Sequence, residues 1–490
     1  MSVNITRTDI IFYPDPSRVI ARFLYTGDER SLKIIKRILE LPEDHVKSTL
    51  TMVLRDFAKR HRNISKIFEN HFEKITHLFE KLDINPDDLS LNRKILIGSF
   101  FTMEYSIESA AFFNPSIVEH PDQSELGPDE KRVVLSFRAT GEGHISSLVF
   151  RAGILDRDNM LVIEEAGQML DEAQVIKRFV YNKQQFMKKL DEMQKFNNIV
   201  PPAIIMDALG DEFTFGELKR CVEHARKSME LSTAKELLLN EIMWLANSHY
   251  EIDFSLDTAL SERVIFPISE SERNGIEDAR FVMFAEDDGT KKYYATYTAY
   301  DGITIMPKLI TTTDFYHFEV LPIHGEIAQN KGMALFPRKI KGRYAMLCRI
   351  DGINNYIAFS DNIGIWRKAE LLQEPRYSWE FIQIGNAGSP IETAEGWLVI
   401  THAVGPVREY VLGAALYDLD DPKKEIGRLR EPLLIPNKEE REGYVPNVVY
   451  SCGSLLHNEN LIIPYAMSDY ASTYAVVNLR ELMYALKNNG

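Results

Sequence analysis

Two adjacent carboxylates, Glu277 and Asp278, precede Arg280 at the point where a loop enters a strand-like run. Gly275 at the entry allows the backbone to turn tightly. A carboxylate held at a loop mouth beside a guanidinium can donate a proton to a leaving oxygen, as the cleavage of a sugar bond requires. Taken alone, the segment is more typical of an ordinary salt-bridged turn. The surrounding elements must therefore decide what it does.

The strand-like run leaves through a second acidic turn, which begins at Tyr300 and Asp301 and ends at Gly302. We include Tyr300 and Asp301 of this turn as candidate substrate-binding residues.

The composition excludes several classes of protein. The chain has 490 residues, too many for one ordinary core, and its net charge is −15. Because it has no long basic run, we expect neither nucleic acid nor an anionic membrane as a partner. No apolar run is long enough to cross a bilayer, and the N-terminus lacks the apolar centre of a signal peptide.

The three cysteines, Cys221, Cys348 and Cys452, are far apart in the sequence. Their odd number and wide spacing argue against a disulfide framework and against a zinc site. We expect buried thiols, a cytoplasmic location, no metal and no cofactor.

The pattern of apolar residues divides the chain into helical and strand-rich parts. Three- and four-residue steps predict helices from about residue 31 to 82 and again from about 173 to 249. We expect an N-terminal helical region (1–95), a first strand-rich part (96–160), a helical insertion (161–260) and the remaining strands (261–490). A separate helical domain is the alternative for the insertion, but the strand pattern resumes after it without a fresh start.

Units of strand, short polar turn and strand recur in the C-terminal half, about 50–60 residues apart. Their turns are Asp287-Asp288-Gly289, Lys341-Gly342, Ala394-Glu395-Gly396 and Asn458-Glu459-Asn460. Together with a unit around 133–150 they make five. The sequence therefore predicts a mainly β fold, a five-bladed β-propeller, although a sandwich also has many short strands.

Candidate functional residues are spread over these units, as expected if loops from every blade meet at one channel. They are Asn114 and Arg138, Asp278 and Arg280, Lys331 and Arg349, Glu392 and His402, then Glu440, Asn447 and Asp469. Each also has an ordinary explanation, because a strand-end arginine is usually a paired surface charge and a single histidine is usually part of a core.

Taken in order, several segments resemble glycoside hydrolase family 130, which includes β-mannoside phosphorylases and β-mannosidases. The matching segments are Phe113-Asn114-Pro115, Leu135-Ser136-Phe137-Arg138-Ala139, Gly275-Ile276-Glu277-Asp278-Ala279-Arg280, Tyr297-Thr298-Ala299-Tyr300-Asp301-Gly302, Ala334-Leu335-Phe336-Pro337-Arg338-Lys339-Ile340, Gly388-Ser389-Pro390-Ile391-Glu392-Thr393, Gly396-Trp397-Leu398, Tyr444-Val445-Pro446-Asn447-Val448-Val449 and Pro464-Tyr465-Ala466-Met467-Ser468-Asp469. They cover about 100–155 and 263–480, and both helical regions lie outside them.

The resemblance implies a five-bladed propeller that cleaves β-mannosidic bonds with inversion, and it implies that Asp278 is the general acid. In the phosphorylases the proton is expected to pass through a hydroxyl of the bound mannose. Asn114, Arg138 and Asp469 match sugar-binding positions in the subsite before the scissile bond. Phosphate-binding positions are matched, exactly or nearly, by Lys331, Arg349 and His402, and Arg408 adds a further cation.

Glu392 departs from the pattern, because the phosphorylases usually carry a lysine in this segment. Phosphate needs positive charge around it, whereas a glutamate could activate water as the general base of an inverting hydrolase. Arg349, Lys331 and Arg408 could still neutralise phosphate. Phosphorolysis with inorganic phosphate as co-substrate is favoured, and hydrolysis with Glu392 as base is the alternative.

Two other classes of function were weighed. A glycan-binding propeller without activity would need the acid position to be vacant, and Asp278 fills it. A scaffold would make the helical regions the main feature, but they carry no cluster of catalytic groups. We expect these regions to cover the propeller side or to mediate self-association as a homo-oligomer. The substrate is expected to be a manno-oligosaccharide, with a β-1,2 linkage favoured although no residue distinguishes it from β-1,3 or β-1,4.

Overall fold

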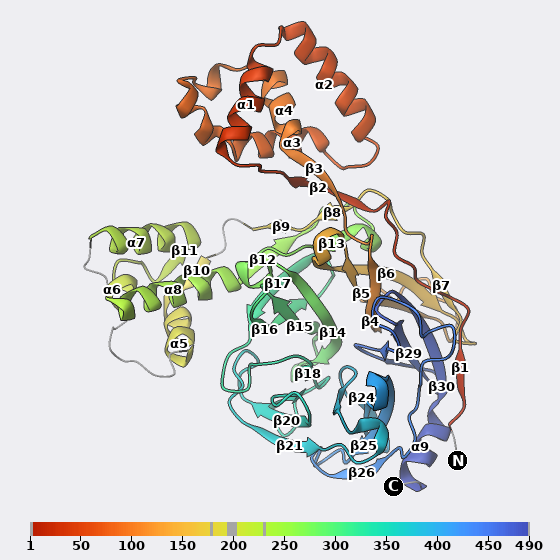
Figure 1. The fold of residues 1–490 in the computed structure, drawn as a ribbon. Helices are drawn as coiled ribbons and strands as arrows, with labels where there is room; N and C mark the ends of the chain where they lie inside the picture. The colour runs from red at the N-terminus through yellow and green to blue at the C-terminus, as the bar shows by residue number, and fades with distance from the viewer. Residues whose placement is uncertain (1–2, 177–179, 194–202, 229–231, 489–490) are drawn as a thin grey trace.

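The computed structural model describes residues 3–176, 180–193, 203–228 and 232–488. It is mainly β, and most of its strands form antiparallel meanders that follow one another around a common centre (Figure 1). Two helical regions lie outside these meanders. The prediction of a mainly β fold is confirmed.

The first two meanders belong to one sheet. The first contains β4 (Ala111–Glu119), β5 (Lys131–Thr140), β6 (Ser146–Leu155) and β7 (Leu161–Ile163). The second contains β14 (Gly275–Ala285), β15 (Lys291–Tyr300), β16 (Ile305–Thr312) and β17 (His317–Pro322). Gly275 pairs with Ser146 and so joins the two meanders at the end where the acidic segment begins.

The third and fourth meanders are separate sheets. The third contains β18 (Ala334–Leu335), β19 (Tyr344–Cys348), β20 (Asn355–Ser360) and β21 (Ala369–Gln373). The fourth contains β22 (Gln383–Asn386), β23 (Ile391–Thr393), β24 (Gly396–Val404), β25 (Tyr410–Tyr417) and β26 (Glu425–Arg428). Both β22 and β23 pair with β24, so together they form its inner neighbour.

The last meander is completed by the N-terminus. It contains β27 (Val449–Tyr450), β28 (Leu455–His457), β29 (Asn460–Met467), β30 (Ala471–Asn478) and β1 (Ile5–Arg7). The pairing of Ile5 with Val477 places β1 at the outer edge of this meander. We predicted a helical region over residues 1–95. That region begins instead with the strand β1, whose backbone hydrogen-bonds to β30 near the C-terminus.

Hydrophobic cores lie between consecutive meanders. Phe150 and Phe281 pack between the first and the second, and Phe336 packs edge-on against Trp397 between the third and the fourth. Tyr474 of the last meander shares a core with Phe112 and Phe137 of the first. The meanders thus bury their faces against one another, and the last packs against the first.

The N-terminal helices form a unit with its own core. They are α1 (Asp28–Leu39), α2 (Glu43–Phe57), α3 (Ile64–Glu73) and α4 (Leu91–Phe100). The ribbon of β2 (Val19–Phe23) and β3 (Thr102–Ser106) joins this unit to the meanders (Figure 1). Ser90 caps α4, since its hydroxyl accepts a hydrogen bond from the Arg93 N–H.

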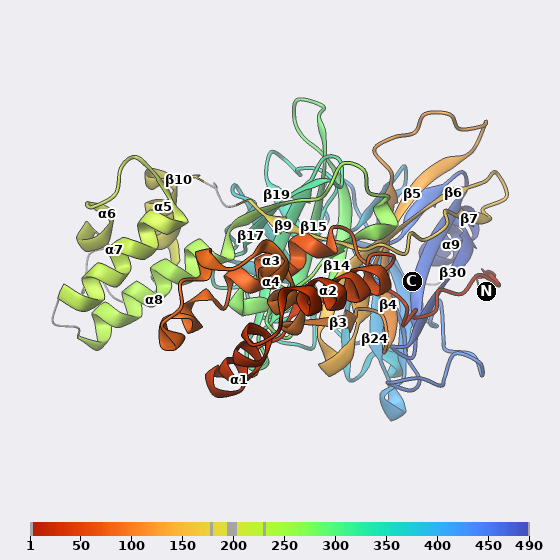
Figure 2. The same cartoon turned by 90° about the horizontal axis from the view of Figure 1, so that it is seen from above.

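The helical insertion lies beside the second meander (Figures 1 and 2). Its elements are β10 (Val180–Asn182), α5 (Lys183–Met193), α6 (Ala203–Met206), β11 (Glu212–Thr214), α7 (Phe215–Ser228) and α8 (Thr233–Ser248). They share a core of their own. Trp244 of α8 contacts the ring of His324 just beyond β17, with ring centroids 5.8 Å apart. None of the described helices has the length and apolar character of a membrane span.

Short elements connect these parts. The remaining strands are β8 (Asp171–Glu172), β9 (Gln174–Val175), β12 (Tyr250–Asp253) and β13 (Arg263–Ile265), and the last helix is α9 (Leu479–Asn488). The short 3-10 helices are η1 (Thr76–Leu78), η2 (Glu80–Leu82), η3 (Pro86–Asp88), η4 (Glu142–His144), η5 (Leu260–Glu262), η6 (Glu270–Glu272), η7 (Ser378–Glu380) and η8 (Pro406–Arg408). Because β12 pairs with β17, the chain leaves the insertion directly into the second meander.

Candidate active site

Asp278 lies in a bulge of β14. The register between β14 and β15 shifts between Glu277 and Arg280, and Asp278 has a φ of 55°. A bulge re-aims the side chain that it carries. The Asp278 carboxylate accepts a 2.7 Å hydrogen bond from the side-chain amide of Asn114 on β4. Asn114 lies in a bulge of its own strand and has a φ of 50°.

Glu277 is held between two cations from neighbouring meanders. Its carboxylate accepts a 2.7 Å hydrogen bond from Arg138 of β5 and a 2.6 Å hydrogen bond from the Lys331 ammonium. Arg138 also lies 3.5 Å from the Asp278 carboxylate and donates through Nε to the Ser146 hydroxyl. Arg138, Glu277 and Lys331 therefore form a charged frame around Asp278.

The two aspartates of the site titrate in opposite directions. Burial opposes ionisation of Asp278, but the charges of Arg138, Lys331 and Arg280 outweigh it, so the pKa of Asp278 is lowered. Burial and the charge of Asp278 raise the pKa of Asp469, in the turn between β29 and β30, to about 6. Asp469 thus lies close enough to Asp278 for the two charges to oppose each other.

Two arginines form a second group beside Asp278. Arg280 donates a 2.7 Å hydrogen bond to the Tyr450 hydroxyl, and Arg349 donates a 3.1 Å hydrogen bond to Nε2 of His402. Within the described part of the chain, nothing accepts a hydrogen bond from Nε of either arginine, although both atoms are buried. Buried donors of this kind are expected to face an acceptor.

His402 orients Arg349 as a neutral ring. Because a guanidinium can only donate, Nε2 of His402 accepts, so Nδ1 carries the proton and donates it to the Asn386 carbonyl at 2.8 Å. Burial and the charges of Arg349 and Arg280 lower the pKa of His402 well below its ordinary value. Gly385 leaves room for the ring, since a Cβ there would lie 2.6 Å from it.

Three other predicted residues lie in or next to turns between strands. Asp301 accepts hydrogen bonds from the Ile303 and Thr304 N–H groups, and Tyr300 donates to the Gly302 carbonyl. These contacts build the turn between β15 and β16. Arg408 is exposed in the turn between β24 and β25, and its charge acts on Asp469. The structure therefore does not bring Arg408 to the Arg280–Arg349 group.

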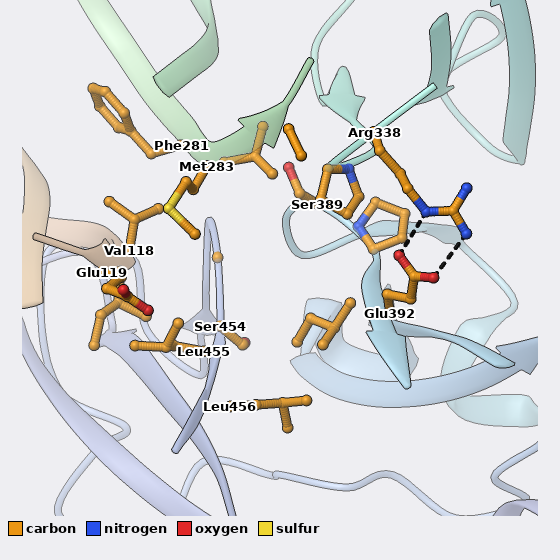
Figure 3. A pocket seen from close by; sticks show the side chains of 17 residues that line it. Val118, Glu119, Phe281, Met283, Arg338, Ser389, Glu392, Ser454, Leu455 and Leu456 are labelled. Carbon is orange, nitrogen blue, oxygen red and sulfur yellow. Dashed lines mark hydrogen bonds and ion pairs between the residues drawn. The ribbon is translucent and has the colours of Figure 1, made fainter. Parts of the chain in front are cut away.

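Glu392 lies in a different place. Its carboxylate forms two 2.7 Å hydrogen bonds with Arg338, and both side chains line a cavity of about 330 Å³ (Figure 3). Residues from the far ends of β4 and β14 line the same cavity, among them Glu119 and Met283.

Strand geometry gives the separation between Asp278 and the Arg338–Glu392 pair. Arg338 forms an isolated bridge with Ala285, and Ala285 follows Asp278 by seven residues along β14, a distance of about 20 Å at about 3.3 Å per residue. A base must reach the reacting centre through at most one water. The structure pairs Glu392 with Arg338 at the end of the meander away from Asp278. This position does not support Glu392 as the general base of the alternative, hydrolytic prediction.

Tyr450 is a site residue that the sequence analysis did not single out. Its ring lies against His402, with centroids 5.0 Å apart, and its hydroxyl accepts from Arg280. The residue directly follows the matching segment that ends at Val449, which is the signal that could have identified it. Elsewhere in the last meander, Glu440 accepts from Arg7 and Tyr465 and so anchors β1.

The side chains that most often hold a metal ion are those of His, Cys, Asp and Glu. Among the described residues, no group of three or more His, Cys, Asp or Glu side chains is placed to hold a metal ion. The carboxylates of Glu277 and Asp278 contact an arginine, a lysine and a side-chain amide. This arrangement is suited to proton transfer and to anion binding.

Comparisons with known proteins identify the family. A family profile described as beta-1,4-mannooligosaccharide phosphorylase matches residues 224–488. A 1,2-beta-oligomannan phosphorylase of Thermoanaerobacter sp. (strain X514) is 35% identical over 46% of this chain and 75% of its own length. A beta-1,2-mannobiose phosphorylase of Listeria innocua is 30% identical over 48% of this chain and 65% of its own length.

The solved structure of the beta-1,2-mannobiose phosphorylase from Listeria innocua, in complex with beta-1,2-mannobiose, aligns with 78% of this chain and 93% of its own. The TM-score is 0.47 and the identity 22%. The family profile covers more than half of the chain, and the Thermoanaerobacter relative matches over three quarters of its length. The chain therefore belongs to glycoside hydrolase family 130.

Proposed function

We propose that this protein is an inverting phosphorylase of β-mannosides, which uses inorganic phosphate and releases mannose 1-phosphate. The observation that carries the proposal is the pair Arg280 and Arg349. The charge of Arg280 acts on Asp278, and the charges of both arginines act on His402 and Tyr450. Two guanidiniums next to a proton donor suit phosphate as the attacking group. The names of the two relatives support a β-1,2 linkage, and the family description supports β-1,4.

The proposed scaffold is a five-bladed β-propeller, with each of the five meanders as one blade. The cores between consecutive meanders, and the packing of the last against the first, support it. In this arrangement β1 closes the ring as the outer strand of the last blade. Asp278, Arg349 and Asp469 then lie at one end of the central channel, and Glu392 lies at the other.

Asp278 is the proposed acid. Its lowered pKa means that the free enzyme holds it as a carboxylate near neutral pH. A phosphate bound at Arg280 and Arg349 would offset part of the positive charge that causes this shift, and the pKa of Asp278 would rise. This rise moves Asp278 toward the protonated form that proton donation requires, and the proton would pass to the leaving oxygen through a mannose hydroxyl.

The other residues hold the reactants. Asn114 and Arg138 position Asp278 and are placed to contact the mannose at the cleaved bond. His402 orients Arg349 and does not itself donate to phosphate, because its only ring proton goes to the Asn386 carbonyl. Lys331 acts through Glu277. Hydrolysis with Glu392 as base is not proposed, since Glu392 is paired with Arg338 at the far end of the strand.

The test is to incubate the protein with β-1,2-mannobiose, with and without inorganic phosphate. We expect α-mannose 1-phosphate, the product of inversion, only when phosphate is present. Asp278→Asn should lower the rate at least about 100-fold. Release of free mannose that does not depend on phosphate would overturn the proposal.

A second variant tests the phosphate site. Arg349→Met should raise the KM for phosphate more than the KM for the disaccharide. Arg343→Met is the matched control, because Arg343 lies in the same meander but is half exposed and paired with Asp361 at 3.3 Å. Equal effects of the two variants on phosphate would contradict the assignment.

A further inference from the structure

Two exposed aromatic side chains from different meanders meet at the end of the strands where Arg138 contacts Ser146. His144 lies in the turn between β5 and β6, and Tyr444 lies in the loop that leads to β27. Their ring centroids are 5.4 Å apart with an angle of 35° between the planes. Tyr444 is 69% exposed. A tyrosine side chain is usually at least half buried, so the exposure of Tyr444 needs an explanation.

The backbone under His144 is fixed. His144 has a φ of 59° and follows Gly143, which has a φ of 69°. The buried hydroxyl of Tyr105 donates to the Glu142 carbonyl at 2.8 Å, and the Gly141 N–H donates to the Ile145 carbonyl at 3.2 Å. A histidine with a left-handed backbone is strained, and strain of this kind gathers at functional sites.

The backbone around Tyr444 is fixed as well. The N–H of Val445 donates to the Ser468 carbonyl at 3.1 Å, and Gly443 packs so closely on Ser468 that a Cβ would lie 2.3 Å from its oxygen. Ser468 directly precedes Asp469. Both rings are therefore exposed on loops that backbone hydrogen bonds hold in place, and the loop of Tyr444 packs on the turn that carries Asp469. A ligand that meets the rings need not order these loops first.

The pair lies on a defined side of Asp278. Arg349 and His402 come from the third and fourth meanders, whereas His144 and Tyr444 come from the first and last. In an inverting displacement the leaving group departs from the face opposite the attacking group. If phosphate binds at Arg349, the leaving sugar must point away from it, toward the loops that carry Asp469 and the aromatic pair.

We propose that His144 and Tyr444 form a wall of the subsite for the leaving sugar, a pyranose that lays its apolar face on one of the two rings. This inference rests on the proposed function and assigns the residues that determine which acceptor sugar binds. Aromatic faces suit such a ligand because they offer apolar area, while Tyr and His also keep a polar tip in water.

The test uses the reverse reaction, with mannose 1-phosphate as donor and mannose as acceptor. Tyr444→Ala should raise the KM for mannose about tenfold and leave the KM for mannose 1-phosphate within twofold. Tyr444→Phe should stay near wild type. Tyr484→Ala is the control, because Tyr484 is 60% exposed but lies on α9.

His144→Gly tests the second ring without adding strain, since glycine tolerates the positive φ. It should change the acceptor KM in the same direction as Tyr444→Ala. A wild-type protein that makes no disaccharide would overturn the proposed function and this inference with it. A wild-type protein that is active, with an acceptor KM unchanged in Tyr444→Ala and His144→Gly, would overturn this inference alone.

Discussion

Asn114 of β4 and Asp278 of β14 meet between two neighbouring strands, and each residue has a left-handed backbone at the point of contact. Such a conformation costs a residue with a Cβ about 1–2 kcal/mol. In both strands the residue lies in a bulge, and the two bulges allow a 2.7 Å hydrogen bond from the Asn114 amide to the Asp278 carboxylate. The position of the proposed acid is therefore built by two irregular strands together.

Asn114→Gly should remove this hydrogen bond while keeping the backbone, since glycine adopts a φ of 50° without strain. The bond stabilises the carboxylate form of Asp278, so its loss raises the pKa of Asp278. The proton donor then persists to higher pH, and the alkaline limb of the kcat profile should move upward while kcat falls about 10- to 100-fold. An alkaline limb that stays in place would show that Asn114 does not act on the acid.

Glu392→Gln should leave activity close to wild type. The carboxylate pairs with Arg338, and the two side chains are 41% and 39% exposed. An exposed pair of this kind contributes about 0.5–1 kcal/mol to stability. Arg338→Gln, which removes the other partner, should cost a similar amount. Steady-state kinetics and urea unfolding measure the two effects, and a loss of turnover in Glu392→Gln alone would revive the hydrolytic mechanism.

The turns of the fold could be predicted from the sequence because their chemistry is local. Asp287-Asp288-Gly289 joins β14 to β15, and Asn458-Glu459-Asn460 joins β28 to β29. Gly289 has a φ of 83°, which is the reason for a glycine at that place. The frame around Asp278 was partly predictable for the same reason, since Glu277, Asp278 and Arg280 share one short segment.

The position of Glu392 could not be predicted by assigning each candidate residue to a unit. Such an assignment does not say at which end of its strand the residue lies. Glu392 lies two residues before the turn at Ala394-Glu395-Gly396, which corresponds to the turn after Ala285 and so to the end of the strand away from Asp278. The pairing of β1 with β30 and the two bulges depend on contacts between distant parts of the chain, so local patterns could not reveal them.

Asp469→Asn should stabilise the protein, and the gain should depend on pH. The folded-state pKa of Asp469 is about 6, above its ordinary value of 3.8, so the wild-type protein loses stability as the pH rises through about 4 to 6. The asparagine variant is spared that loss. At 1.36 kcal/mol per pKa unit its advantage is at most about 3 kcal/mol at pH 7.5 and about half of that at pH 5. Urea unfolding at the two pH values measures the difference.

Asp301→Asn is the control with the opposite sign. Hydrogen bonds from the Thr304 and Ile303 N–H groups lower the pKa of Asp301, so its carboxylate supports folding at pH values above its ordinary pKa. The variant should be less stable than wild type at neutral pH, and the deficit should shrink as the pH falls. If Asp469→Asn behaves like Asp301→Asn, the raised pKa of Asp469 is incorrect.

A buried ion pair holds the segment that leads to the acid. Lys308 and Glu272 have no exposed side-chain area, and the ammonium donates to the carboxylate at 2.8 Å. Glu272 also accepts from the hydroxyls of Tyr250 and Tyr297, and it lies three residues before Gly275. Burial raises its pKa, but the charge of Lys308 and these hydrogen bonds outweigh burial and lower the pKa to about 2.

Lys308→Met should therefore cost about 3–5 kcal/mol at neutral pH, because it leaves a buried carboxylate without its cation. The pKa of Glu272 then rises, and protonation at lower pH should remove part of the loss. The double variant Lys308→Met with Glu272→Gln should recover part of it at every pH, since no charge remains to be buried. Urea unfolding of the three proteins between pH 5 and 8 is the measurement. A loss that is the same at every pH, and that the double variant does not relieve, would mean that packing around the lysine side chain and not charge is what stabilises this segment.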